Sequence, residues 1–185
     1  ERSSNFSSHL ISHGAEISRN DFNARFNDEG SECMLNGLFM IGDEQLFDAH
    51  TMIDHAKPHC NSHEHYKGIL QDKSKGVFNG KVMVRQDAQK TNAFQENNTI
   101  LLSDNAVMNT KPQLEIFADD VKCSHGATIG KLNDEAKFYL KSRGIGEDAA
   151  TAILIHAFAS DVITSIKIPA LRDYLEEIIS KRFNA

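Results

Sequence analysis

The densest group of side chains capable of chemistry lies between residues 50 and 65. It contains five histidines and a cysteine: His50, His55, His59, Cys60, His63 and His65. Imidazole and thiolate are ligands of zinc, iron and copper, and Cys60-x-x-His63-x-His65 would allow two or three ligands from one loop. No second cluster with metal-finger spacing completes a four-ligand shell. A self-contained metal site made of His59, Cys60, His63 and His65 therefore competes with a polar, histidine-rich loop, and we favour the loop.

A second candidate is the pair Cys123 and His125. On an extended strand, residues two apart project from the same face. A thiol beside an imidazole forms a metal-capable pair, or a nucleophile with its base. The pair cannot close a metal shell alone, so a partner chain, a substrate or further residues must complete it. A buried structural pair is the alternative, because Val121 and Ile129 share that face unless Gly126 introduces a bulge.

Signals for catalysis by the chain itself are weak. The sequence has no phosphate-binding glycine loop, no Gly-x-Ser-x-Gly elbow and no His-Glu-x-x-His segment. Asp119 and Asp120 would be the first candidates for a polysaccharide-cleaving carboxylate pair on a β-helix. Two acids between apolar runs are more typical of a turn. We therefore expect a protein that is not an enzyme.

The elements that must position these residues change character near Leu132. Before it, apolar runs of strand length occupy residues 33–41, 51–53, 68–70, 77–84, 99–102, 114–118 and 121–129. Turn-type pairs bound them, such as Gly42-Asp43, Asn79-Gly80, Asn97-Asn98 and Asp104-Asn105. This pattern predicts an all-β body and leaves a sandwich, a barrel and a parallel β-helix open, although polar turns suit the corners of a solenoid.

The remaining residues read as three amphipathic helices. Asn133 is a suitable N-cap for the first helix, and Arg143-Gly144 is a suitable stop. A second helix should begin near Glu147, and Pro169 suits the first turn of a third. These helices are expected either to cap an exposed edge of the β body or to form a docking surface.

Composition excludes some classes of partner. The formal net charge is −6 and the basic residues are interspersed with acids, so we expect neither a nucleic-acid nor an anionic membrane surface. The longest apolar run is far below the roughly 18 residues of a membrane span. Three cysteines without framework spacing favour free thiols in a reducing compartment.

Long collinear motifs connect this chain to a known family. In order, they are Ala56-Lys57-Pro58-His59-Cys60-Asn61-Ser62, Tyr66-Lys67-Gly68, Gly76-Val77-Phe78-Asn79-Gly80-Lys81-Val82, Ala88-Gln89-Lys90-Thr91, Leu101-Leu102-Ser103, Thr110-Lys111-Pro112-Gln113-Leu114-Glu115-Ile116, Ala118-Asp119-Asp120-Val121-Lys122-Cys123-Ser124-His125-Gly126-Ala127-Thr128 and Phe138-Tyr139-Leu140-Lys141-Ser142-Arg143-Gly144-Ile145. They resemble the SufB/SufD family of the iron–sulfur cluster assembly machinery. The segment 122–127 resembles the SufD form, since SufB-type chains carry a Glu-His-Glu-Ala-like segment there and an earlier cysteine that residues 99–107 lack.

The resemblance implies a right-handed parallel β-helix over residues 1–132 and a helical segment over 133–185 that docks the ATPase SufC. It implies pairing with SufB through the β-helix, or with a second copy when the chain is alone. Cys123 and His125 would lie at the SufB junction, where His125 would be the stronger ligand for iron or a transient nascent cluster, with no cofactor held stably by the isolated chain. His59 and Cys60 are weaker metal candidates.

The resemblance also bears on the extent and the location of the chain. Its first residue is not Met, and we expect it to lack an N-terminal helical domain and the first coils of the solenoid. Members of this family would work in the cytoplasm of a bacterium or in a plastid.

Overall fold

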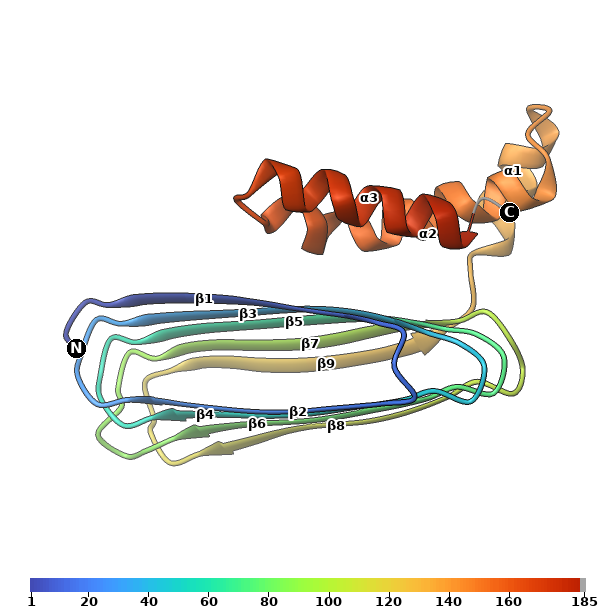
Figure 1. The fold of residues 1–185 in the computed structure, drawn as a ribbon. Coiled ribbons are helices and arrows are strands. Elements are labelled where there is room, and N and C mark those ends of the chain that lie inside the picture. Colours follow the sequence, from blue (N-terminus) through green and yellow to red (C-terminus); the bar gives the residue numbers. More distant parts are fainter. Residues whose placement is uncertain (184–185) are drawn as a thin grey trace.

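Nine strands precede three helices in the computed structural model, which describes residues 1–183 (Figure 1). The strands are β1 (Asn5–His13), β2 (Ile17–Phe26), β3 (Glu32–Ile41), β4 (Leu46–His55), β5 (Asn61–Leu70), β6 (Lys75–Val84), β7 (Asn92–Leu101), β8 (Val107–Ile116) and β9 (Lys122–Gly130). The helices are α1 (Asp134–Ser142), α2 (Glu147–Ser165) and α3 (Pro169–Phe183).

The strands form two parallel sheets that face each other. Odd-numbered strands make one sheet in the order β1-β3-β5-β7-β9, and even-numbered strands make the other in the order β2-β4-β6-β8. Successive strands therefore alternate between sheets, and each coil of the chain stacks on the preceding one in parallel register (Figure 1). This arrangement is a parallel β-helix, which confirms the predicted fold class and removes the sandwich and the barrel.

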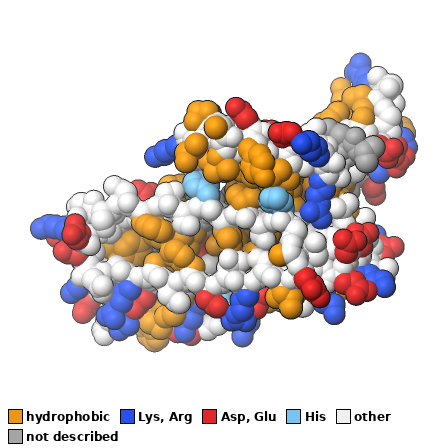
Figure 2. Space-filling view, in the orientation of Figure 1, with side chains coloured by type: hydrophobic (Ala, Val, Ile, Leu, Met, Phe, Trp, Pro, Cys, Tyr) orange, Lys and Arg blue, Asp and Glu red, His pale blue; other side chains and the backbone are white. Residues whose placement is uncertain are grey.

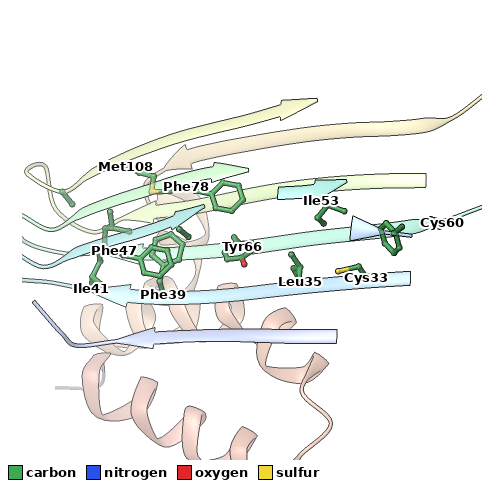
Figure 3. Close-up of a cluster of buried hydrophobic side chains, with 14 residues drawn as sticks. Cys33, Leu35, Phe39, Ile41, Phe47, Ile53, Cys60, Tyr66, Phe78 and Met108 are labelled. Atoms are coloured by element: carbon green, nitrogen blue, oxygen red, sulfur yellow. The ribbon is translucent and has the colours of Figure 1, made fainter. Parts of the chain in front are cut away.

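The inward faces of the two sheets meet in an apolar core. Strand β6 shows the alternation, because Gly76, Phe78, Gly80, Val82 and Val84 are all buried while the residues between them are partly exposed. Figure 3 shows the core side chains of neighbouring coils stacked along the solenoid, with Phe39 lying on Phe47. Burial of these inward rows drives the coils to stack.

Two polar dipeptides that were predicted as turns lie inside strands instead. Asn79-Gly80 is in the middle of β6, and Asn97-Asn98 is in β7. Gly80 faces inward, where an added β-carbon would overlap the side-chain amide of Gln95. Asn97 is buried and its Nδ2 donates to the carbonyl of Tyr66 at 3.3 Å. The prediction was wrong because polar side chains bond to neighbouring strands of the stack on both faces of a sheet: Asn97 does so inside, and Asn79 does so outside, where its Nδ2 lies 3.3 Å from His50 Nε2.

Helices α2 and α3 pack on the outer face of the odd-numbered sheet. Leu38, Met40 and Ile69 point outward and form one cluster with helix residues that include Ile155 and Ile179. Figure 2 shows hydrophobic side chains and histidines along this junction. The contact explains why β3 ends in a run that is buried on both faces. The helices do not cover the last strands, so the prediction that they could cap an exposed edge was wrong.

Local signals for the helix ends are confirmed. The Asn133 side chain accepts a hydrogen bond from the N–H of Ala136 at 2.9 Å, which satisfies one free donor of the first turn. Gly144 follows α1 with a φ of 85°, in the left-handed region that favours glycine. Helix α2 begins at Glu147 and α3 begins at Pro169, as predicted.

Lys67 joins α2 to the solenoid. Its side chain is 8% exposed, and Nζ donates to the carbonyl of Phe158 at 2.8 Å and to Asp161 Oδ2 at 2.5 Å. We expect Lys67→Met to lower the free energy of unfolding by about 1–3 kcal/mol, because the Phe158 carbonyl loses its donor while Asp161 stays hydrated. Urea unfolding together with hydrogen exchange in α2 measures the effect.

The exposed Lys111, which has no ion pair within residues 1–183, supplies the matched control Lys111→Met. We expect this control to change stability by less than about 0.5 kcal/mol. Equal losses in the two variants would contradict a specific role for Lys67 in docking α2.

Candidate metal-ligand site

Strand β9 carries Cys123 and His125 and is the last strand of its sheet. It pairs with β7 on one side, and its register runs without interruption from Lys122 to Gly130. Gly126 therefore introduces no bulge. Cys123 and His125 project from the same face, as the spacing predicted.

That face is the inward one. Cys123 stands beside Ala93 of β7 in the row that contains Cys33 and Ser62. His125 stands beside Gln95 in the next polar row. Because no strand within residues 1–183 stacks on β9, the inward face of this last coil opens to solvent. The two side chains thus lie at the mouth of the solenoid interior and not deep inside it.

The two side chains differ in burial. Cys123 is partly buried and packs against the apolar cluster of Val82, Val84 and Ala93, whereas His125 is exposed. The alternative prediction, a buried pair with a structural role, therefore holds in part for Cys123. His125 makes no side-chain hydrogen bond in the part of the chain that the structure describes. Its imidazole is free to bind a group brought to this end.

The end of the solenoid that carries the pair exposes apolar side chains and unpaired strand edges. Strand β8 ends the other sheet, and Val107, Ile116 and Phe117 near it are 43%, 41% and 63% exposed. Ile129 of β9 is 46% exposed. The outer edges of both strands also present backbone donors and acceptors. A strand of another chain could therefore pair with this end through backbone hydrogen bonds.

Burial raises the pKa of the Cys123 thiol above its ordinary value, and a hydrogen bond from the Ala93 backbone opposes the shift. At neutral pH the thiol therefore stays protonated, and Cys123 is not an activated nucleophile in the isolated chain. A metal ion would deprotonate it on binding. The pair suits coordination better than nucleophilic catalysis.

The pair does not form a complete shell by itself. No group of three or more His, Cys, Asp or Glu side chains within residues 1–183 is arranged to hold a metal ion. Two ligands from β9 would leave two positions of a four-coordinate site open.

The residues of the histidine-rich segment lie in different environments: the core, the outer face of a strand and a turn. Cys60 is buried in the core cluster that also contains Cys33 and Ile53 (Figure 3), and its Sγ donates to the carbonyl of Asp28 at 3.4 Å. His63 and His65 lie on the outer face of β5, where His63 stacks on Phe94 at 5.2 Å. His59 sits in a turn with a φ of 59°. The structure does not bring these four candidates together.

The other members of that segment have local partners. His55 is fully buried and bonds to Ser62 Oγ through Nε2 at 2.8 Å, and burial lowers its pKa to about 4. His50 lies 2.9 Å from Asp48 on the outer face of β4. Asp120, one of the two acids considered for catalysis, pairs with Lys90 in the turn before β9.

Glu64 and Gln95 are buried polar residues that sequence reasoning missed. They are 2% and 1% exposed, and Gln95 Nε2 donates to Glu64 Oε2. Burial raises the pKa of the Glu64 carboxyl. The sequence pattern that could have revealed them is the alternation of Ser62, Glu64 and Tyr66 along one strand, because it places an acid in the inward row.

Comparison with known proteins finds a matching family model and several similar sequences. Residues 1–158 match the model of the SUF system FeS cluster assembly, SufBD core domain. The chain is 40% identical over 95% of its length to the iron–sulfur cluster assembly protein SufD of Escherichia coli and covers 41% of that protein. It is 39% identical over 91% of its length to the SufBD family protein slr0076 of Synechocystis, covering 37% of it.

A plant protein shows a comparable similarity. The chain is 37% identical over 88% of its length to the chloroplastic protein ABCI7 of Arabidopsis thaliana and covers 34% of that protein. The chain thus spans roughly two-fifths of the length of these relatives. Within residues 1–183, no helix combines the length and the apolar character that a membrane crossing requires.

Proposed function

Because this chain belongs to the SufBD family of iron–sulfur cluster assembly proteins, we propose that it acts as a scaffold subunit in cluster assembly and not as an enzyme. The observation that carries the proposal is the position of Cys123 and His125 at the open end of the solenoid. There they form part of a coordination shell that a second chain could complete. Iron or the nascent cluster is the cargo of this site.

The second chain would be SufB. The uncovered edges of β8 and β9 offer it backbone hydrogen bonds, and the exposed Val107, Ile116 and Ile129 offer it apolar contact. His125 is the stronger ligand, since its imidazole is exposed and unbonded in the described residues. Cys123 would bind as a second ligand once a metal ion lowers the pKa of its thiol.

The C-terminal helices would dock the ATPase SufC. Phe138 and Tyr139 of α1 are 73% and 58% exposed, and Tyr174 of α3 is 54% exposed. These side chains lie on helices whose other faces already pack on the solenoid or on each other, so they are free for a partner. The bacterial and chloroplastic relatives support a bacterial cytoplasm or a plastid as the compartment.

His125→Ala in the full-length protein tests the proposal. With SufB and SufC present, we expect cluster yield to fall at least about tenfold, because losing a ligand should cost at least as much as losing its hydrogen-bonding support. Circular dichroism and SufC binding should stay unchanged. The exposed His13 of β1 supplies the control His13→Ala, for which full yield is expected. Unchanged yield in His125→Ala would remove this residue from the mechanism.

The alternative is a self-contained metal-binding protein that uses His59, Cys60, His63 and His65. Metal analysis of the isolated chain separates the two functions. One tightly held ion per chain would favour the alternative, and none would favour the scaffold.

A further inference from the structure

A row of polar side chains runs through the solenoid interior and ends on His125. Glu64 of β5, Gln95 of β7 and His125 of β9 are register partners on neighbouring strands of one sheet. Such strands lie about 4.8 Å apart, so inward side chains at matched positions lie next to one another. Glu64 and Gln95 are 2% and 1% exposed, whereas His125 stands at the open end.

The hydrogen bond between Glu64 and Gln95 orients the Gln95 amide. Gln95 Nε2 donates to Glu64 Oε2, so the amide nitrogen points toward β5. The amide oxygen, Gln95 Oε1, is buried and has no hydrogen-bond partner among the described residues. Buried acceptors are almost always satisfied, and an unsatisfied one destabilises the folded state. The next residue along the row that can donate is His125.

The opposite sheet is shaped to hold this amide. Gly80 of β6 faces Gln95, and an added β-carbon there would overlap Nε2 and Cδ of the Gln95 side chain. Glycine in a strand interior weakens the strand, and it commonly marks a close approach by another group. The amide is therefore clamped between Glu64 on one side and a glycine on the other.

We propose that Gln95 is a positioning residue for His125: the structure shows no hydrogen bond at Gln95 Oε1, and a rotation of the exposed His125 side chain toward it would let one ring N–H donate to this oxygen, while Glu64 holds the amide in the orientation that allows the bond. The other ring nitrogen is then left unprotonated and directed toward the open end, where a metal ion binds. Metal-bound histidines usually donate their second N–H to such an acceptor, which fixes the tautomer. The inference rests on the proposed function, in which His125 is the ligand.

The tautomer of His125 in the metal-free, full-length protein is the first test. Nitrogen NMR with ¹⁵N-labelled histidine at about pH 8 reports which ring nitrogen carries the proton. His125→Ala identifies the signals by their absence. We expect a single tautomer for His125, as opposed to the mixture that a freely solvated imidazole shows. A mixture in the parent protein would overturn the inference without any variant.

Gln95→Met is the second test, because methionine has a similar length and shape but no strong acceptor. We expect His125 to revert to a tautomer mixture, and the iron affinity of the assembled complex to fall about 10- to 100-fold. An unchanged tautomer in this variant would overturn the inference. Should Gln95→Met fail to fold, Gly80→Ala displaces the same amide from the opposite sheet and carries the same expectation.

Asn97→Leu is the matched control. Asn97 is buried in the same strand, two residues along, and its register partner on β9 is Ala127. We expect this variant to lose stability while the His125 signals stay unchanged. The two proposals can be overturned separately. Full cluster yield in His125→Ala overturns the role of His125 as a ligand, whereas an unchanged His125 tautomer in Gln95→Met overturns only the positioning role of Gln95.

Discussion

Phe39→Ala is expected to lower the free energy of unfolding by about 3–5 kcal/mol, the range for removing a large aromatic side chain from a close-packed core. Phe39 is 0% exposed, and its ring stacks on Phe47 with centroids 4.1 Å apart and planes 8° apart. On the next coil, the ring covers Gly68, where a β-carbon would overlap it. The variant thus empties a site that two neighbouring coils share, and the rigid sheets can collapse into it only in part.

Urea unfolding followed by circular dichroism measures this loss. Phe138→Ala is the matched control, because Phe138 lies on α1 and is 73% exposed. A surface truncation of this kind should change stability by less than about 0.5 kcal/mol. A loss below about 1 kcal/mol in Phe39→Ala would contradict the close packing of this core.

The second large effect is a loss of stability in acid that depends on His55. Burial lowers the pKa of this side chain to about 4 in the folded chain, against an ordinary value of 6.5. Between these values the unfolded chain binds the extra proton, so stability falls as the pH falls from about 6.5 toward 4. The shift corresponds to about 3 kcal/mol of stability that is fully present above the ordinary pKa.

His55→Gln isolates this effect, because glutamine can still bond to Ser62 but does not titrate. Glu64 contributes with the opposite sign, since its raised pKa favours the folded state at low pH. The difference in stability between the parent and the variant, measured from about pH 7 to about pH 4.5, removes that contribution. Parallel pH profiles for the two proteins would show that His55 does not titrate between the states.

The all-β body and the three helices were predictable because their signals are local. Strands such as β2, β4 and β6 show the period of two, and α1 begins at the capping side chain of Asn133. The choice of a β-helix over a sandwich or a barrel came from the family resemblance. Alternation along one strand says which residues share a face, but it does not say which strand lies beside it.

Polar pairs within strands were the main source of error. Asn79-Gly80 and Asn97-Asn98 were predicted as turns from their intrinsic preferences, and both lie inside strands. A β-helix can hold such groups within its strands because they bond to a neighbouring coil: Asn97 donates inside to the carbonyl of Tyr66, and Asn79 meets His50 on the outer face. Local preference gave way to tertiary hydrogen bonding.

The sequence by itself determined that Cys123 and His125 share a face, since any extended chain projects alternate side chains to one side. Only the tertiary structure decided that this face opens at the end of the solenoid and that Glu64 and Gln95 align with His125. It also decided that α2 and α3 cover the outer face of a sheet and leave the last edge bare. These features depend on register between segments far apart in the chain, which is set by the collective packing of the coils.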